Sequence, residues 1–232
     1  MPFELAVTCP KTIGYLEYEQ REPVDDEVLV RTTVSGIKHG TELNTYRGVI
    51  PFADRLWDPG LRVFRPLRPG EKAEPFFPHT MGSWAAGVVV AVGPRVRRFR
   101  PGDHVHGEWK HRQTVIRAEE ALYPVASEAD DETMVFSDPA RFALAGIHDA
   151  EIKLGDHVAI FGLGAIGMLA LQMARLSGAE KVFAVDPIPG RLELARMLGA
   201  DVTIDPTEYD AGLAIKEATG GVDVALEITG AY

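Results

Sequence analysis

The chain has 232 residues, enough for one large domain or two modest ones, and its hydrophobic and charged fractions are those of an ordinary globular protein. Its formal net charge of −10 argues against nucleic acid or an anionic membrane as the main partner. The single cysteine, Cys9, excludes an intramolecular disulfide and any zinc site made of several cysteines.

Residues 1–11 show no charged start followed by an apolar stretch, so they do not resemble a signal peptide. The longest apolar run, residues 158–171, carries three glycines and is too short to cross a bilayer. We therefore expect a cytoplasmic protein with no membrane and no nucleic-acid partner.

The first part of the chain, to about residue 125, has the pattern of a β-rich domain. Short alternating runs at 27–34, 85–93 and 113–118 are separated by Gly, Pro and Asp turns, which predicts a small barrel or sandwich. Residues 49–81 interrupt this pattern. They are rich in Pro, Arg and aromatic residues without a clear period, so we predict a long ordered loop with room for short helices.

From about residue 138 the sequence alternates between helical and strand patterns. Such alternation predicts a parallel sheet with helices on both faces. The predicted helices cover 138–152, 165–177, 190–198 and 208–219, and the predicted strands cover 157–162, 181–186, 201–205 and 222–230.

The stretch "FGLGAIG" follows a predicted strand and opens a predicted helix. Its glycines, Gly162, Gly164 and Gly167, have the spacing of a dinucleotide-binding turn. Gly162 allows the tight turn, Gly164 lets a pyrophosphate approach the backbone, and Gly167 lets helix pack on strand. The free N–H groups at the helix start then face the phosphates.

Asp186 ends the next predicted strand, at the spacing expected for an acid that binds the ribose hydroxyl. A carboxylate there would repel a 2′-phosphate, so we predict NAD rather than NADP, although Arg191 nearby is suited to a phosphate. The predicted cofactor-binding residues are Gly162, Gly164, Ala165, Ile166, Gly167, Asp186, Arg191, Thr229 and Gly230.

Together with these features, five motifs occur in one order: "AAGVVVAVG", "RFRPGDHVHG", "LGDHVAIFGLGAIGMLALQMARLSGA", "VDPIPGRLELARMLGAD" and "GVDVALEITG". In this succession the chain resembles the medium-chain dehydrogenase/reductase superfamily, the zinc-type alcohol dehydrogenase-like proteins. The resemblance implies an α/β protein with a β-rich N-terminal domain. A GroES-like β-barrel catalytic domain at 1–138 would precede a partial doubly wound parallel (Rossmann) sheet at 139–232, with the active site in the cleft between them.

A full Rossmann sheet has six strands, whereas we predict four here. We therefore expect the chain to be the first part of a longer protein. Relatives in the superfamily form dimers and tetramers, so the resemblance also implies a homo-oligomer.

Zinc-dependent members of the superfamily hold a catalytic zinc with a cysteine, a histidine and a further cysteine or acid. Aligned on those motifs, the three positions carry Lys38, the pair Ser83–Trp84, and Ser137 or Asp138. Lysine offers a cation and serine is a poor neutral ligand, so we expect no zinc of the usual kind. Only His39, Glu42 and His79 would serve as improvised ligands.

Without zinc, a side chain must take or give the proton that accompanies hydride transfer. By the resemblance, Lys38 stands at the position of a metal ligand, where it could act as acid or base or polarise a carbonyl. We predict Lys38, His39 and Glu42 as catalytic residues. The alternative is that "KHGTE" is only a polar turn that starts a short helix.

Other side chains invite weaker predictions. Three histidines, His104, His106 and His111, lie near barrel strands, and we interpret them as scattered surface residues. The long loop carries Arg62, Arg65 and Arg68, which are suited to hold an anionic substrate group. The predicted substrate-pocket residues are Trp57, Ser83, Trp84 and Ser137.

These observations leave three hypotheses. The first is a zinc-independent, NAD(H)-dependent oxidoreductase acting on a hydroxyl or carbonyl group of a small organic substrate. The second is an NAD(P)H-dependent quinone or enoyl reductase, in which hydride adds to an activated double bond. The third is a dinucleotide-binding protein without catalysis.

Overall fold

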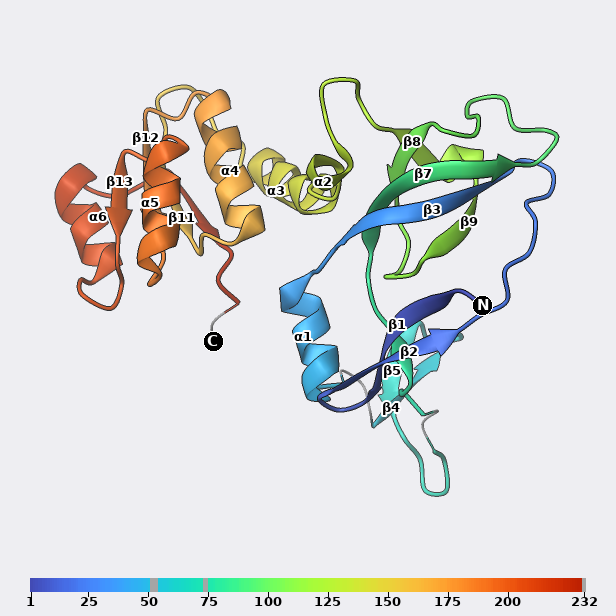
Figure 1. Cartoon of the computed structure of the whole chain (residues 1–232). Helices are drawn as coiled ribbons and strands as arrows, with labels where there is room; N and C mark the ends of the chain where they lie inside the picture. The colour runs from blue at the N-terminus through green and yellow to red at the C-terminus, as the bar shows by residue number, and fades with distance from the viewer. Residues whose placement is uncertain (51–53, 73–74, 231–232) are drawn as a thin grey trace. The chain divides into compact units, whose positions relative to one another are not determined.

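A computed structural model describes the chain at residues 1–50, 54–72 and 75–230 (Figure 1). By its internal contacts the chain divides into two compact units, Met1–Val135 and Phe136–Tyr232, called the N-terminal and C-terminal units below. Each is described by itself. The sequence prediction placed the division between residues 138 and 139.

The N-terminal unit is built on antiparallel sheets. A five-stranded sheet has the order β10-β8-β7-β3-β9 and a three-stranded sheet the order β2-β1-β6. The strands are β1 (Phe3–Cys9), β2 (Thr12–Glu17), β3 (Glu27–Gly36), β6 (His79–Thr80), β7 (Trp84–Val92), β8 (His104–Gly107), β9 (Thr114–Ala118) and β10 (Leu122–Pro124). The predicted β-rich first domain is confirmed.

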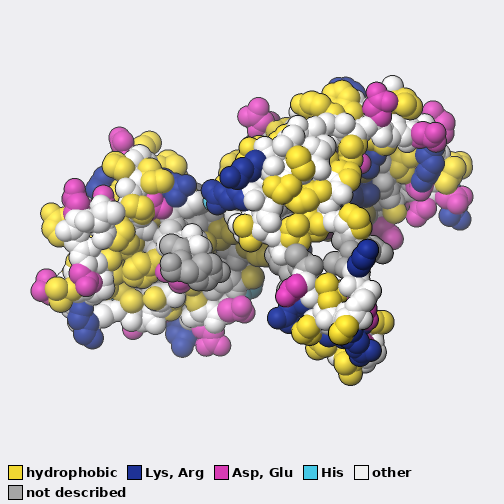
Figure 2. All heavy atoms as spheres, turned by 90° about the horizontal axis from the view of Figure 1, so that it is seen from below, with side chains coloured by type: hydrophobic (Ala, Val, Ile, Leu, Met, Phe, Trp, Pro, Cys, Tyr) yellow, Lys and Arg dark blue, Asp and Glu magenta, His cyan; other side chains and the backbone are white. Residues whose placement is uncertain are grey.

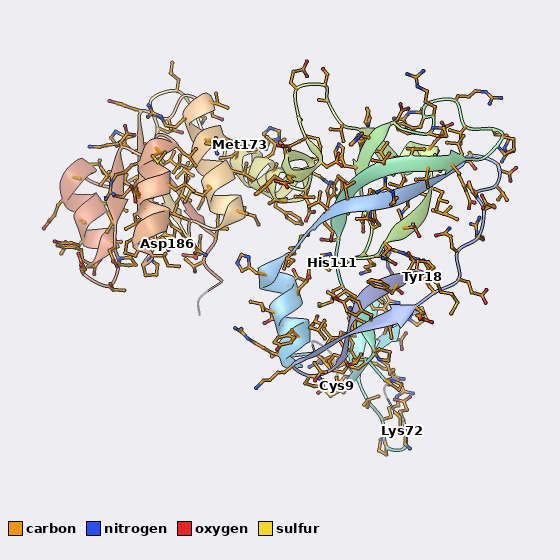
Figure 3. The ribbon with its side chains drawn as sticks, viewed as in Figure 1. Cys9, Tyr18, Lys72, His111, Met173 and Asp186 are labelled. Atoms are coloured by element: carbon orange, nitrogen blue, oxygen red, sulfur yellow. The ribbon has the colours of Figure 1, made fainter. Side chains whose placement is uncertain are left out.

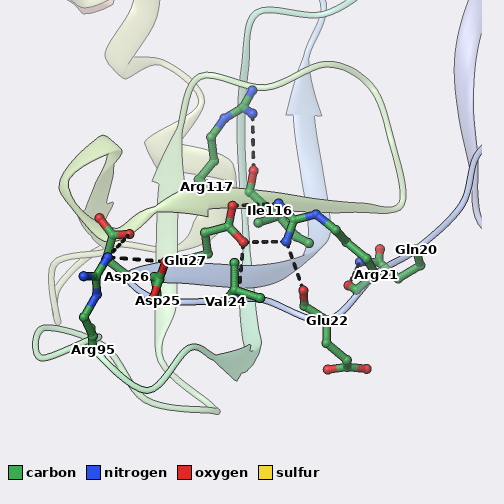
Figure 4. A network of polar contacts seen from close by, with 10 residues as sticks. All are labelled: Gln20, Arg21, Glu22, Val24, Asp25, Asp26, Glu27, Arg95, Ile116 and Arg117. Carbon is green, nitrogen blue, oxygen red and sulfur yellow. Dashed lines mark hydrogen bonds and ion pairs between the residues drawn. The ribbon is translucent and has the colours of Figure 1, made fainter.

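Alternation along β3 and β7 explains the core of this unit. Val28 and Val30 point to one side and are fully buried, together with Val89 of β7 and Trp109 from the loop after β8. The turn into β3 is fixed by charge, because Arg21 binds both carboxylate oxygens of Glu27 at 2.5 and 2.6 Å (Figure 4).

Two short helices flank these sheets. Helix α1 (His39–Arg47) follows β3 directly and ends at Gly48, which adopts a left-handed conformation. Helix α2 (Asp131–Met134) begins at Asp130, whose side chain accepts the backbone N–H of Thr133. A single 3₁₀ turn, η1 (Glu119–Ala121), joins β9 to β10.

The long loop at 49–81 differs from its prediction. Where it is described it forms a hairpin, β4 (Arg55–Asp58) and β5 (Val63–Pro66), together with β6, and no helix; residues 51–53 and 73–74 lie outside the described part. Trp57 faces Phe64 across the hairpin with ring centroids 5.1 Å apart. Asp58 caps the turn by accepting the N–H groups of Gly60 and Leu61. The "DPG" sequence at residues 58–60 is a turn signal that could have predicted this hairpin.

The C-terminal unit contains a four-stranded parallel sheet with the order β13-β12-β11-β14. Its elements are α3 (Ser137–Asp149), β11 (His157–Phe161), α4 (Ala165–Leu176), β12 (Lys181–Val185), α5 (Pro189–Met197), β13 (Val202–Ile204), α6 (Ala211–Thr219) and β14 (Val224–Glu227). The predicted α/β fold is confirmed, with each strand and helix near its predicted position.

Both faces of the sheet are buried along β11 and β12, as expected for parallel strands with helical crossovers, whereas Ala225 and Glu227 of β14 are exposed. Val158 and Ile160 of β11 pack on one face against α4, whereas Ala159 packs on the other face with residues of α6. Helix α6 begins later than predicted because Asp210 caps it, accepting the N–H of Leu213 at 2.9 Å.

The surface carries both signs of charge. On the face drawn in Figure 2, basic and acidic side chains intermingle with hydrophobic ones on both units. Among the described residues, no helix has the length and apolar character that a bilayer crossing requires.

Candidate functional site

The glycine-rich turn between β11 and α4 is shaped by backbone contacts. Gly162 has a φ of +92°, and a Cβ there would lie 2.8 Å from the backbone nitrogen of Thr229. At Gly167 a Cβ would lie 1.9 Å from the carbonyl oxygen of Gly162. The turn therefore admits no side chain at either position.

Helix α4 starts at this turn with Gly164 as its N-cap. No side chain caps the helix, and its first turn holds no acidic residue. The first N–H groups of a helix have no partner within it, so those of Ala165, Ile166 and Gly167 are suited to an anion. The structure thus brings the predicted phosphate-binding residues together, and their role stays a prediction.

Asp186 follows β12 (Figure 3). Its side chain is almost fully buried, with 2% exposed. Its Oδ2 accepts the N–H of Leu163 at 2.8 Å, and its Oδ1 accepts the N–H of Ile188 at 2.9 Å. Arg191 of α5 donates to Oδ2 at 3.1 Å. The carboxylate therefore ties the glycine-rich turn to the start of α5, and Arg191 compensates its charge.

Thr229 and Gly230 follow β14, the strand beside β11. The N–H of Ile228 donates to the carbonyl of Phe161 at 2.8 Å, which places this segment against the turn. Thr229 donates from its backbone to Glu227 at 2.8 Å. The structure therefore places Thr229 beside Gly162, although the two are distant in sequence, and Gly230 follows Thr229 directly.

The segment Lys38–Glu42 forms the N-terminus of α1. Lys38 is the N-cap and is half-buried, whereas His39 is exposed. Glu42 is the only buried residue of the helix. Its Oε1 accepts the backbone N–H of Lys38 at 2.9 Å, so the carboxylate caps the helix in place of an N-cap side chain.

The second oxygen of Glu42 binds a histidine from a distant loop. His111 Nε2 lies 2.9 Å from Glu42 Oε2, and His111 Nδ1 lies 2.7 Å from the hydroxyl of Ser35. Burial alone raises the pKa of a carboxyl. Hydrogen bonds from His111 and the Lys38 amide, with the nearby Lys110 charge, nevertheless hold the pKa of Glu42 below its usual value.

The interpretation of three surface histidines is wrong for two of them. His104 is exposed and pairs with Asp131 at 2.8 Å. His106 is buried, accepts a hydrogen bond from Trp84 Nε1 at 3.2 Å, and has its pKa lowered by burial. His111 is nearly as buried. No local pattern around His111 marks it, because its partners are 69 and 76 residues away.

The predicted substrate-pocket residues are spread through the structure. Trp84 pairs with Gly36, so Ser83 and Lys38 lie at the same end of the sheet; the Trp84 ring itself packs against His106 and Tyr123. Trp57 is half-exposed on the β4–β5 hairpin, and Ser137 begins α3 in the C-terminal unit. Their substrate role stays a prediction.

Arg65 is paired with Glu71, and its role in an anion site stays a prediction. Its two terminal nitrogens lie 2.6 and 2.7 Å from the two oxygens of Glu71. A cavity of about 590 Å³ in the N-terminal unit is lined by other residues, including Thr33, His104 and Asp131, and by none of the predicted catalytic residues.

Two of the improvised zinc ligands, Glu42 and His79, have contacts within the protein. Glu42 uses both oxygens internally, and the ring of His79 stacks on Phe76 at 4.3 Å. Within the described ranges, no three or more His, Cys, Asp or Glu residues gather closely enough to hold a metal. An ammonium group at Lys38 would also repel a cation.

Two family models match the chain. The alcohol dehydrogenase GroES-like domain matches residues 24–124, and the zinc-binding dehydrogenase domain matches residues 165–232. The first match covers most of the N-terminal unit, and the second begins at Ala165, the first residue of α4, and runs to residue 232.

Curated relatives agree with these matches. The chain is 35% identical over 234 residues to D-guloside 3-dehydrogenase of Escherichia coli (strain K12), which covers 98% of this chain and 67% of the relative. It is 32% identical over 248 residues to (R,R)-butanediol dehydrogenase of Bacillus subtilis (strain 168), covering 94% and 67%. The chain thus spans about two thirds of the length of either relative.

A solved structure shares the fold. A crystal structure described as a zinc-binding dehydrogenase from Sinorhizobium meliloti 1021 bound to NADP superposes with a TM-score of 0.78 at 25% identity, covering 100% of this chain and 70% of that one.

Proposed function

The chain belongs to the medium-chain dehydrogenase/reductase superfamily, and from that premise we propose that it oxidises a secondary hydroxyl group of a polyol or sugar-like substrate with NAD. An alcohol dehydrogenase-like oxidoreductase activity follows from its relatives. The observation that carries the finer proposal is the glycine-rich turn, which opens an uncapped helix beside a buried acid, Asp186.

The residues present fit a dinucleotide. Backbone N–H groups of Ala165, Ile166 and Gly167 would hold the pyrophosphate, and Asp186 would accept from the ribose. A carboxylate offers about four lone-pair positions, of which Leu163, Ile188 and Arg191 use three. One position remains for a ribose hydroxyl, which supports NAD over NADP.

When bound, NAD supplies the hydride acceptor. We propose that the segment Lys38–Glu42 takes up or supplies the substrate proton without zinc. In this proposal the Nζ atom of Lys38 takes the role that the zinc ion, a Lewis acid, has in zinc-using relatives. The aligned residues support this proposal, because Lys38 offers an ammonium group at the position where zinc-using relatives place a metal ligand. We propose that Glu42 orients the segment, since one of its oxygens accepts from the Lys38 amide and the other from His111.

A substrate panel tests the proposal. The intact protein is mixed with a D-guloside, (R,R)-2,3-butanediol or a simple enone, each with either cofactor, and reduced nicotinamide is followed by absorbance. Turnover of an alcohol with NAD supports the proposal. Turnover of the enone alone with NADPH would favour a reductase, and cofactor binding without any turnover would favour a non-catalytic protein.

Metal content tests the zinc-independent part separately. The purified protein should contain far less than one zinc per chain and keep its activity after dialysis against a chelator. Stoichiometric zinc that is lost together with activity would overturn this part while leaving the hydride chemistry intact.

A further inference from the structure

His111 lies at a junction of three segments in the N-terminal unit. Its carbonyl accepts the N–H of Leu5 in β1, and its N–H donates to the carbonyl of Met81, both at 2.8 Å. Gly82 makes this approach possible, because a Cβ there would lie 2.5 Å from the His111 nitrogen. The backbone of His111 is therefore fixed by two elements other than its own loop.

The side chain of His111 reaches the end of β3 and the start of α1 (Figure 3). A carboxylate only accepts hydrogen bonds, so the Nε2 atom that faces Glu42 carries the hydrogen. The Nδ1 atom faces the hydroxyl of Ser35, which can donate or accept. Both ring nitrogens thus have partners, and the ring has one defined orientation.

Glu42 links the His111 ring to the backbone of Lys38. One carboxylate oxygen binds His111, and the other binds the backbone N–H of Lys38. The carbonyl of Lys38 in turn accepts the N–H groups of Thr41 and Glu42, at 3.0 and 2.8 Å. The backbone N–H of Lys38 is therefore bound by the Glu42 side chain, and its carbonyl is bound by the N–H groups of Thr41 and Glu42.

Helix α1 has one buried side chain, and it lies near the N-terminal end. Glu42 is its only buried side chain, so it has no apolar face that would fix its position. Its other end is fixed independently, where the carbonyl of Tyr46 accepts the N–H of Lys11 at 2.6 Å and Gly48 lies against Pro10. At the N-terminal end, the buried side chain of Glu42 is held by His111.

We propose that His111 is a positioning residue, which acts through Glu42 to hold Lys38 in place for proton transfer. The proposal rests on the proposed function for its catalytic consequence. Its structural part, that His111 orders the segment Lys38–Glu42, stands without it. The contact fixes a backbone rather than a reacting atom, so loss of His111 should move the kcat for the substrate more than the KM for NAD.

Amide hydrogen exchange tests the ordering on the full chain without any substrate. We compare the wild type with His111→Ala and His111→Gln, and with His104→Ala as a matched control, since His104 also pairs with a carboxylate in this unit. The Lys38 amide should exchange about tenfold faster in His111→Ala. His111→Gln, whose amide can still donate to Glu42, should lie between, and His104→Ala should match the wild type.

Equal exchange at Lys38 in His111→Ala and the wild type would overturn the proposal. Should His111→Ala fail to fold, His111→Gln and Ser35→Ala carry the same comparison. Ser35→Ala removes only the orienting hydroxyl, so a smaller increase in exchange at Lys38 is expected there. No increase in either variant would overturn the proposal as well.

Kinetics test the catalytic consequence, with whichever alcohol of the panel the wild type oxidises. His111→Ala should lower kcat by about 10- to 100-fold, with the KM for NAD unchanged, and His111→Gln should restore part of kcat. Equal losses in kcat for His111→Ala and His104→Ala would overturn the positioning role. A wild type that oxidises no alcohol contradicts the proposed function instead, and the exchange result still decides the ordering.

Discussion

The two candidate sites of this chain are built in opposite ways. The turn at residues 162–167 is contiguous, made of backbone, and defined by where side chains are missing. The segment Lys38–Glu42 depends on side chains, and its partners Ser35 and His111 lie 76 residues apart. A backbone site is specified by local sequence, whereas a side-chain network exists only once the sheets have formed.

Substitutions in the two sites should therefore have different effects. A substitution in the turn changes the shape of the backbone and should strongly weaken cofactor binding. A substitution in the network leaves buried polar groups without partners and should act mainly on stability and order. The following predictions test this contrast, from the largest expected effect to the smallest.

The largest effect is expected for Gly167→Ala. The added Cβ would lie 1.9 Å from the carbonyl oxygen of Gly162, and neither backbone can move easily. We expect a loss of about 3 kcal/mol in the stability of the C-terminal unit, and NAD binding weaker on the order of 100-fold. Calorimetric titration with NAD measures the binding, and circular dichroism measures the unfolding.

Gly146→Ala in α3 is the matched control. A Cβ there meets no atom within 4 Å, so helix propensity should make this change neutral or slightly stabilising. Unchanged NAD binding in Gly167→Ala would contradict the assignment of this turn as the cofactor site.

Next in size is Glu42→Ala. The change leaves the Lys38 amide and the His111 ring without their acceptor, so we expect the N-terminal unit to lose about 2 kcal/mol of unfolding free energy. All three tryptophans, Trp57, Trp84 and Trp109, lie in this unit, so their fluorescence reports its unfolding alone.

The exposed Glu120→Ala serves as the control for Glu42→Ala and should leave the denaturant midpoint unchanged. NAD binding should be the same in both variants, because Glu42 does not belong to the turn. Equal midpoints for Glu42→Ala and Glu120→Ala would show that the network contributes nothing to stability.

A smaller effect is expected for Arg191→Ala, which tests the one side-chain pair of the cofactor site. Arg191 is 40% exposed, so its pairing with Asp186 contributes at most about 1 kcal/mol. Removing it leaves the charge of Asp186 uncompensated, and we expect NADP to bind about tenfold more weakly while NAD changes by about threefold or less. Equal losses for both cofactors would contradict the role given to Asp186.

The smallest effect is expected for the stability of the N-terminal unit at low pH. The pKa of Glu27 is lowered from 4.5 to about 2, chiefly by the hydrogen bond from Arg21 (Figure 4). The folded state therefore keeps a charge that the unfolded state loses first. The stabilisation is present above pH 4.5 and disappears as the pH falls toward 2.

Glu27→Gln should remove this part of the acid sensitivity. The fluorescence-detected stability of the N-terminal unit should then fall less between pH 5 and pH 3 than in the wild type. Parallel curves for the two proteins would show that the pair is too exposed to matter.

Sequence patterns located the C-terminal unit well because its signals are local. The strand β11 and the helix α4 lie within one residue of their predicted ends, since an apolar run, a glycine turn and a helical period each act over short distances. The hairpin β4–β5 was not predicted, because its signal is not local to one strand. Its stability depends on Trp57 meeting Phe64 across the turn, which no single-strand period reveals.

The sequence by itself determined the superfamily, the α/β architecture with a β-rich first unit, and the shape of the glycine-rich turn. Each follows from short motifs and from their order along the chain. Only the tertiary structure decided that Glu42 anchors α1, that His111 is buried, and that Arg65 is already paired. Those outcomes depend on which distant polar groups meet inside the fold, where a buried charge is stable only with a partner.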